Sequence, residues 1–339
     1  MYELKFDEKM CAVCETCDCL VRCPYLNLDL EHAKKEVEKL IQGDNSMVLT
    51  ECVTCYSCEE YCPYGNHPFY RIVELQESQD IYPAPKPIMN QQIKSMSPVG
   101  KGKVEELKDP VISLCAFPEA KKALRGDLFQ NPNNYFGRDY FCNLMYLHFA
   151  RSSIIKERLP RIIENIWKQK LNKSESKELI CYHDECYATY TSWAPAYGIE
   201  VPFKPMHFYE YLYNRIRASM ENITPIDAKV AYQRPCSNRL IPEQQHWVDD
   251  IFELLGAQRV KREYDREDAL CCGGILRMQG RDDLAHDLQM KNLEDMEAAG
   301  VDYCVFNCPF CSYTLSEMVK ERNIKPIMMI DLCTLSWNN

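Results

Sequence analysis

Apolar residues recur at helical spacing in several stretches of the chain. One helical face is formed by Leu30, Ala33, Val37, Leu40 and Ile41. Asp29 can cap the start of this helix and Gly43 can end it, so we expect a helix over Glu31–Ile41. The same reasoning predicts four more helices, at Pro68–Gln79, Ile154–Leu171, Gln244–Leu255 and Asp282–Ala299.

Short apolar runs alternate with helical patterns from residue 111 onward, which is typical of α/β structure. They predict strands at Val111–Leu114, Leu179–Tyr182, Val201–Phe203, Lys229–Gln233, Asp302–Phe306 and Lys325–Ile327. Before the first of these strands, residues 81–110 contain five prolines and two glycines. This composition predicts an extended linker between the part of the chain before it and the part after it.

The sequence after this linker repeats itself. In the first copy, a strand leads to Cys115, then comes Tyr140-Phe141-Cys142-Asn143, and then His183-x-x-Cys186. The corresponding elements of the second copy are Cys236 after its strand, Leu270-Cys271-Cys272-Gly273 and Cys308-x-x-Cys311. A repeat of this size predicts two similar α/β units, residues 111–222 and 223–339, that pack pseudo-symmetrically.

The chain has 339 residues, a net charge of −10 and 20 cysteines, and the cysteines set it apart from an ordinary globular protein. A secreted disulfide scaffold is the first alternative. However, the start of the chain, MYELKFDEKM, does not resemble a signal peptide, and the cysteines cluster in C-x-x-C runs. No apolar run is long enough to span a bilayer. We therefore expect a cytoplasmic protein with reduced thiols that bind metal, and the negative charge argues against a nucleic-acid partner.

Cys52-x-x-Cys55-x-x-Cys58-x-x-x-Cys62-Pro63 is the spacing of bacterial ferredoxins. Zinc sites use C-x-x-C as well, but they usually pair two such units or include histidine. Four cysteines at this spacing, closed by proline, therefore predict a [4Fe–4S] cluster.

A second run lies upstream and has an irregular spacing: Cys11-x-x-Cys14-x-x-Cys17, then Cys23-Pro24, with Cys19 inside the last gap. In two-cluster ferredoxins the fourth cysteine of each run binds the other cluster. This rule assigns one cube to Cys11, Cys14, Cys17 and Cys62, and the other to Cys52, Cys55, Cys58 and Cys23. Cys19 is either a spare buried thiol or replaces Cys17 as a ligand.

The third group of cysteines comprises Cys236, Cys271, Cys272, Cys308 and Cys311. Vicinal cysteines on a strand would point to opposite faces, so Cys271 and Cys272 can share a site only on an irregular turn. Gly273 and Gly274 permit that turn. Isolated core cysteines do not occur as a vicinal pair plus a C-x-x-C, and we therefore interpret this group as a metal site.

This pattern resembles the cysteine-rich CCG domain of heterodisulfide reductase catalytic subunits. The resemblance implies that the five cysteines hold a non-cubane [4Fe–4S] cluster, which is the catalytic centre in that family. The helix predicted between the two upstream cysteine runs resembles the alpha-helical ferredoxin module of the small heterodisulfide reductase subunit. The chain thus looks like the small and the catalytic subunits fused.

The first copy departs from the family pattern, because Phe141 replaces one vicinal cysteine and His183 replaces one cysteine of the C-x-x-C. Three alternatives stay open. Cys115, Cys142, His183 and Cys186 hold a conventional cluster or a zinc ion, or His183 with Asp184 and Glu185 donates protons near the intact cluster. In the third alternative, the copy is a relic with buried, inert thiols.

The remaining cysteines and histidines lie outside these patterns. Cys181, Cys304 and Cys333 are expected to be buried core thiols. The other histidines have no metal-like spacing and are expected at the surface or in the core: His32, His67, His148, His207, His246 and His286.

Together these features predict an α+β multidomain fold. An alpha-helical ferredoxin-like domain (1–80) and the linker (81–110) precede a degenerate (111–222) and an intact (223–339) CCG unit. The resemblance implies an oxidoreductase subunit that passes electrons through two cubes to the non-cubane cluster and acts on a disulfide or thiol. The expected partners are a flavoprotein of the heterodisulfide reductase A-like type, a ferredoxin or a membrane cytochrome, which would attach the protein peripherally to a membrane complex. The alternative is a non-catalytic electron-transfer subunit of a flavoprotein- or quinone-linked complex.

Overall fold

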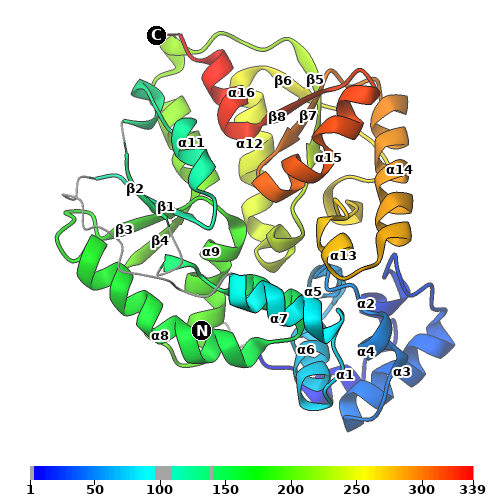
Figure 1. Ribbon diagram of the computed structural model, residues 1–339. Coiled ribbons are helices and arrows are strands. Elements are labelled where there is room, and N and C mark those ends of the chain that lie inside the picture. Colours follow the sequence, from blue (N-terminus) through cyan, green and yellow to red (C-terminus); the bar gives the residue numbers. More distant parts are fainter. Residues whose placement is uncertain (1–3, 96–108, 131, 137–139, 339) are drawn as a thin grey trace.

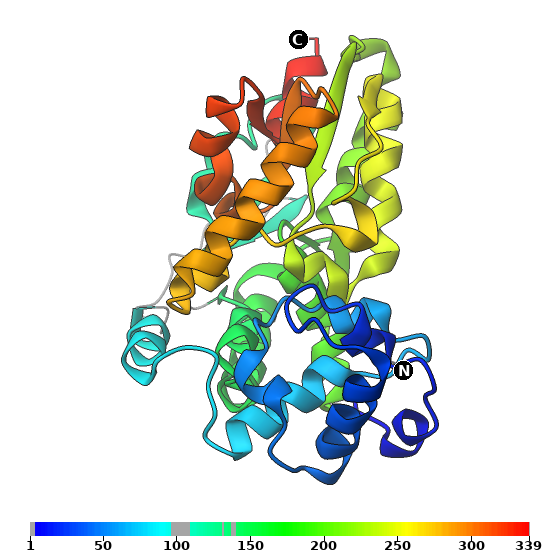
Figure 2. The ribbon, with the colours of Figure 1, turned by 90° about the vertical axis from the view of Figure 1, so that its right-hand side faces the viewer.

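The computed structural model describes residues 4–95, 109–130, 132–136 and 140–338 (Figure 1). It combines a helical amino-terminal part with two parallel sheets, so the prediction of a mixed α+β fold is confirmed. The two views show the helical part at one end of the molecule and the chain's carboxyl end at the opposite one (Figures 1 and 2).

The regular structure described before residue 96, here called the helical part, consists of helices alone. They are α1 (Glu8–Ala12), α2 (Asp18–Val21), α3 (Leu30–Gln42), α4 (Met47–Glu51), α5 (Ser57–Tyr61), α6 (Pro68–Ser78) and α7 (Lys86–Ser95). The predicted helix between the cysteine runs is α3. The Asp29 side chain accepts a hydrogen bond from the His32 backbone N–H at its start, and Gly43 ends it in the left-handed conformation. Both expected caps are confirmed.

The expectation of an extended linker over residues 81–110 is wrong for the stretch that forms α7. Pro85 and Pro87 suggested an extended chain, but both lie at the start of this helix, where a missing backbone N–H costs no helical hydrogen bond. Met89 anchors α7 with a buried side chain in the large hydrophobic core. Residues 96–108 of the predicted linker lie outside the described residues.

Two four-stranded parallel sheets follow the helical part. The first has the order β2-β1-β3-β4 and the second has the order β6-β5-β7-β8. The strands of the first are β1 (Val111–Cys115), β2 (Asn133–Phe136), β3 (Glu178–Cys181) and β4 (Lys204–His207). Those of the second are β5 (Ala228–Gln233), β6 (Ala257–Arg259), β7 (Tyr303–Phe306) and β8 (Lys325–Met328). We call each sheet with its helices the first and the second unit. Their identical strand order and parallel pairing support the internal repeat.

One predicted strand is misplaced. The apolar residues Val201–Phe203 suggested a strand, but β4 begins at Lys204. Pro202 has no N–H to donate to the ladder, whereas the Lys204 N–H donates to the Lys177 carbonyl oxygen at 3.0 Å. Phe203 is buried in the core without being part of the sheet. The apolar run therefore marked core burial rather than strand pairing.

Helices surround the two sheets. Those of the first unit are α8 (Ser152–Ile166), α9 (Asp184–Ala188), α10 (Ala194–Ala196) and α11 (Phe208–Arg217). Those of the second are α12 (His246–Leu255), α13 (Gly274–Met278), α14 (Asp282–Ala298), α15 (Pro309–Glu321) and α16 (Met329–Ser336). Single π-helical turns occupy Trp167–Leu171 and Thr189–Trp193. Short 3₁₀ turns are η1 (Pro118–Lys122), η2 (Asp127–Phe129), η4 (Leu144–Phe149), η7 (Met220–Asn222), η8 (Cys236–Leu240), η9 (Pro242–Gln245) and η10 (Arg266–Asp268).

The two units share one hydrophobic core. Apolar side chains of β1 and β3 belong to the same buried cluster as those of β5 and β7. In its centre the hydroxyls of Tyr209 and Tyr232, one from each unit, lie 3.2 Å apart. Continuous apolar burial fixes the units against each other, and this packing sets the loops of both sheets around one pocket. No helix that the structure describes is long and apolar enough to cross a membrane.

Candidate metal centres

The five thiols of the second unit come from three separate loops. Cys236 follows β5 at the start of η8, Cys271 and Cys272 form the turn before α13, and Cys308 caps α15, with Cys311 in its first turn. The thiol of Cys272 hydrogen-bonds with those of Cys271 and Cys311. Four of the five residues are buried and Cys236 is half-buried. The fold thus gathers all five thiols at the carboxyl ends of parallel strands.

Gly273 makes the turn that lets two vicinal cysteines share the site. It has φ +83°, a left-handed conformation that side chains rarely adopt. A Cβ here would lie 2.7 Å from the Gln289 Nε2 atom, which donates to the Cys272 carbonyl oxygen at 2.8 Å. A Cβ on Gly274 would lie 2.6 Å from the Phe310 ring. The expected irregular turn is confirmed, and it is also the place where α13 packs closely on α15.

An imidazole faces this group of thiols. The pKa of Cys308 is lowered to about 5, mainly by the hydrogen bond with the Cys311 thiol. Burial acts in the opposite direction, and the positive charge of His183 lowers this pKa further. Burial alone would lower the pKa of His183, but the negative charge of the facing Cys308 thiolate raises it to about 10. A thiolate beside a cationic ring is a ready metal ligand.

The two units and the helical part enclose one pocket at these thiols, with a volume of about 220 Å³. Its lining includes Cys236, Cys272, Cys308 and Cys311 from the second unit, and Cys115, His148, His183 and Glu185 from the first. The volume is below the 300 Å³ or more of common small-molecule sites. A cluster and a small reacting group would fill it.

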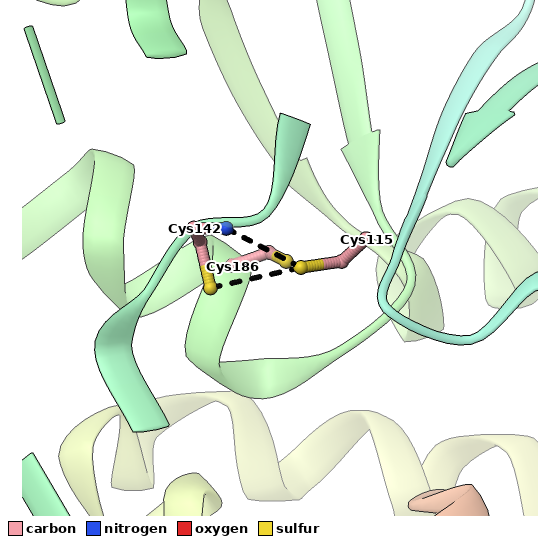
Figure 3. A group of neighbouring side chains, drawn as sticks. All are labelled: Cys115, Cys142 and Cys186. Atoms are coloured by element: carbon pink, nitrogen blue, oxygen red, sulfur yellow. Dashed lines mark hydrogen bonds between the residues drawn. The ribbon is translucent and has the colours of Figure 1, made fainter. Parts of the chain in front are cut away.

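Three thiols of the first unit form a tighter group (Figure 3). Cys115 ends β1, Cys142 precedes η4, and Cys186 lies in α9. Their sulfur atoms all lie within 4.8 Å of one another, and those of Cys115 and Cys142 are 3.8 Å apart. Among the described residues this is the one group of three or more potential ligands that meets this limit.

The backbone of this group follows the same plan as the second unit. Asn143 is left-handed with φ +67°, at the place of Gly273 in the repeat. The Cys142 N–H donates to the Cys115 sulfur at 3.4 Å, which orients the acceptor thiol.

His183 does not belong to the group of three thiols, although the sequence suggested it as a fourth ligand. His183 stands directly before α9, as Cys308 stands directly before α15. Its ring, however, lies in the shared pocket and faces Cys308. Its Nδ1 atom lies 3.9 Å from a Glu185 carboxylate oxygen. The structure therefore separates the predicted four-residue set into three thiols and one imidazole of the pocket.

Sequence reasoning missed His148. Its Nε2 atom lies 3.9 Å from the Cys236 sulfur and 3.8 Å from a Glu185 carboxylate oxygen. Burial raises the pKa of Glu185 to about 8 and lowers that of His148 to about 3. No metal-like spacing signals His148. The internal repeat could have found it, because it follows Cys142 at the interval at which the pocket residue Met278 follows Cys272.

In the helical part, Cys23 comes close to the second run. Burial, together with the neighbouring Cys55 thiol, raises the pKa values of Cys52 and Cys23 to about 12. Cys58 is close to Cys52 and Cys55 as well. Cys55 also lies near Cys236, where it adds to the effect of burial in raising the pKa of that thiol. The second run is thus near Cys23 and near Cys236 of the second unit.

The first run surrounds a cavity of its own, lined by Cys11, Cys14, Cys17, Cys19 and Cys62. Cys62, the last cysteine of the second run, therefore lies with the first run. Burial raises the pKa of Cys11 to about 12, and the nearby thiols of Cys14, Cys62 and Cys17 add to this effect. Such thiols stay protonated unless a metal displaces the protons.

Buried charges fix the helical part to the second unit. Glu60 of α5 accepts hydrogen bonds from Arg234 at 2.8 Å and Arg239 at 2.7 Å. A second contact joins the helical part to both units. The Gln279 amide of the second unit donates to the Thr54 hydroxyl of the helical part at 3.0 Å and to the His148 carbonyl oxygen of the first unit at 3.1 Å. These contacts hold the second cysteine run against the pocket.

The remaining thiols are in the core. Cys181, Cys304 and Cys333 are completely buried, and none of them lines the described pockets, so the prediction that they are core thiols is confirmed. His207 is buried beside Asp184 at 3.1 Å, and His32 pairs with Asp29 at the surface.

Comparison with known proteins agrees with this site. Residues 230–316 match the family model of the CCG cysteine-rich domain, and this segment carries all five thiols of the second unit. Residues 230–316 are thus similar to the cysteine-rich domain that this family model describes. A related protein is the D subunit of the dihydromethanophenazine:CoB–CoM heterodisulfide reductase of Methanosarcina barkeri (strain Fusaro / DSM 804), which is 26% identical over 155 residues. The match covers 44% of this chain and 37% of that relative, so the chain spans little more than a third of the relative's length.

Proposed function

We propose that the chain is an iron–sulfur oxidoreductase subunit that delivers electrons to a disulfide or thiol in the shared pocket. In this proposal residues 1–80 are a two-cluster ferredoxin domain, 81–110 a linker, 111–222 a degenerate CCG unit and 223–339 an intact one. The observation that carries the proposal is the pocket itself, where thiols of the intact unit open onto a cavity lined by His183 and Glu185.

The placement of the cysteines supports an electron path. One cube would be held by Cys62 with the first run, and the other by Cys23 with Cys52, Cys55 and Cys58. Because Cys55 lies near both Cys23 and Cys236, the second cube would stand between the first cube and the pocket. Electrons would then reach a non-cubane cluster on Cys236, Cys271, Cys272, Cys308 and Cys311.

The chemistry of the pocket fits disulfide reduction. Breaking one S–S bond to two thiols takes two electrons and two protons, and each iron–sulfur cluster supplies one electron at a time. His183 and Glu185 line the pocket and lie within 3.9 Å of each other, so they can hold protons beside the reacting sulfurs. This arrangement supports the proton-donor alternative for His183.

We propose further that the three thiols of the first unit bind zinc. With Zn–S bonds of about 2.3 Å, a tetrahedral ion places its thiolates about 3.8 Å apart. This is the separation of the Cys115 and Cys142 sulfurs. A [4Fe–4S] cluster spreads its thiolates more widely, because each binds a different iron.

Electrons must come from a partner. We propose a flavoprotein, a ferredoxin or a membrane cytochrome as the donor, and a cytoplasmic location that includes peripheral attachment to a membrane complex. The acidic net charge of −10 disfavours nucleic acid as a partner.

The test is a comparison of two serine variants in anaerobically purified protein. The wild type should be brown, bleach with dithionite and reduce a small disulfide with reduced methyl viologen. Cys272→Ser should abolish this turnover, while the control Cys304→Ser, which changes a core thiol outside the pocket, should keep it. Unchanged turnover in Cys272→Ser would show that the thiol group of the second unit is not the catalytic centre.

A further inference from the structure

The first cysteine run offers one thiol too many. Five cysteines line its cavity, namely Cys11, Cys14, Cys17, Cys19 and Cys62. A [4Fe–4S] cube takes four thiolates. Spacing does not decide between Cys17 and Cys19, but the backbone of the two runs does.

The helices α2 and α5 begin in the same way. The residue before α2 is Cys17, with φ +48°, and the residue before α5 is Tyr56, with φ +64°. Both are left-handed, and neither makes a side-chain capping hydrogen bond. The same backbone bond follows, because the Leu20 N–H donates to the Cys17 carbonyl oxygen at 2.9 Å and the Glu59 N–H to that of Tyr56 at 3.0 Å.

This correspondence fixes the register between the runs. Cys19 is the second residue of α2 and Cys58 is the second residue of α5. From there both runs continue with the same interval, to Cys23-Pro24 and to Cys62-Pro63. Cys19 therefore occupies the position of Cys58, the third cysteine of the regular run, and the extra residues of the first run lie between Cys14 and Cys19.

Cys17 occupies the position that Tyr56 has in the regular run, and Tyr56 is not a cluster ligand. The Tyr56 ring is buried in the core, 4.6 Å from the Phe69 ring and 4.7 Å from the His148 ring between centroids. The Cys17 thiol points to the Cys14 carbonyl oxygen at 3.9 Å.

We propose that the first cube is held by Cys11, Cys14, Cys19 and Cys62, and that Cys17 remains a thiol beside it. This inference rests on the proposed two-cluster function of the helical part. It concerns the ligand set of one cube and not the reaction.

The test compares Cys17→Ser with Cys19→Ser in the full chain, purified anaerobically, by iron and sulfide content and by EPR of the dithionite-reduced protein. Cys17→Ser should match the wild type in both. Cys19→Ser should lose about four irons per chain, or show a changed EPR signal if serine binds in place of the thiolate. Cys58→Ser, the corresponding change in the regular run, is the matched control and should lose the other cube.

Loss of iron in Cys17→Ser, or identical iron content and spectra in the two variants, would overturn the assignment. If Cys19→Ser does not fold, Cys17→Ser decides alone. Full iron content with an unchanged EPR signal supports the assignment, and loss of about four irons per chain overturns it. A wild type without iron in residues 1–80 would refute the two-cluster function itself, which is a different outcome from a wrong ligand.

Discussion

The two α/β units share a backbone and differ in chemistry. Each has four parallel strands in the same order, a cysteine at or shortly after the end of a central strand, and a left-handed residue directly after a later cysteine. In the second unit that residue is Gly273, and four of the five thiols line the pocket. In the first it is Asn143, and three thiols form a compact group while His183 faces the other unit. The comparison shows that one fold can present an imidazole and a thiol cluster to the same pocket by changing a few ligands.

The largest expected difference between the units is in redox turnover. Cys272→Ser should lower disulfide reduction at least about a hundredfold, since the proposed catalytic cluster would lose a ligand. Cys142→Ser should leave the iron content unchanged and reduce the zinc content. Steady-state assays with metal analysis of both variants would show this. Equal loss of iron in the two variants would mean that both units hold iron clusters.

The units also differ in how they attach to the helical part. Glu60 joins that part to Arg234 and Arg239 of the second unit, and the side chains of both arginines are almost fully buried. Glu60→Ala leaves these two cations without their partner, which should cost about 3–5 kcal/mol in the free energy of unfolding. Urea unfolding under anaerobic conditions measures this loss. A cost below about 1 kcal/mol would show that the contact does not fix the helical part.

The left-handed residues of the two units, Gly273 and Asn143, can be exchanged by mutation. Asparagine tolerates the conformation, so Gly273→Asn tests space rather than backbone strain. Its Cβ would collide with Gln289 and Ala285, and we expect a loss of about 1–3 kcal/mol in stability. The reverse change, Asn143→Gly, causes no collision but removes the hydrogen bond that the buried Asn143 amide donates to the Phe141 carbonyl oxygen, and it should cost about 1–3 kcal/mol. Unchanged stability of Gly273→Asn in urea unfolding would contradict the tight packing of the Gly273 turn.

The smallest effect is expected at the rim of the same interface. Asp268 pairs with Arg22 at 3.3 Å, and both side chains are exposed. Exposed pairs of this kind contribute about 0–1 kcal/mol, so Asp268→Asn should unfold almost like the wild type. It serves as the control for Glu60→Ala, because it removes a contact between the same two regions. A large loss here would show that the rim, and not the buried charges, stabilises the attachment.

Sequence reasoning succeeded where a local signal decides the structure. The caps of α3, the β strands that lead to Cys115 and Cys236, and the turn at Gly273 all follow from residues next to one another in the chain. It failed where contacts across the fold decide. The helix α7 depends on burial of Met89 against another part of the chain, and Phe203 is apolar because of the core and not because of a sheet.

The candidate site shows the same division. Spacing identified the cysteine runs, but it left open whether His183 is a metal ligand of the first unit or a proton donor near the intact cluster. Its neighbour Cys308, which comes from the second unit, becomes visible only when the two units are packed together. The sequence did not predict His148 as a site residue, because it contacts Cys236 of the other unit and is far from it in the chain.

The central claim is that the thiols are bonded to metal in three iron–sulfur clusters and one zinc site. The most direct measurement is the iron, sulfide and zinc content per chain after anaerobic purification. Our account predicts about twelve irons, about twelve sulfides and about one zinc, on four irons for each cluster. A colourless protein that contains zinc but no iron or sulfide would contradict it.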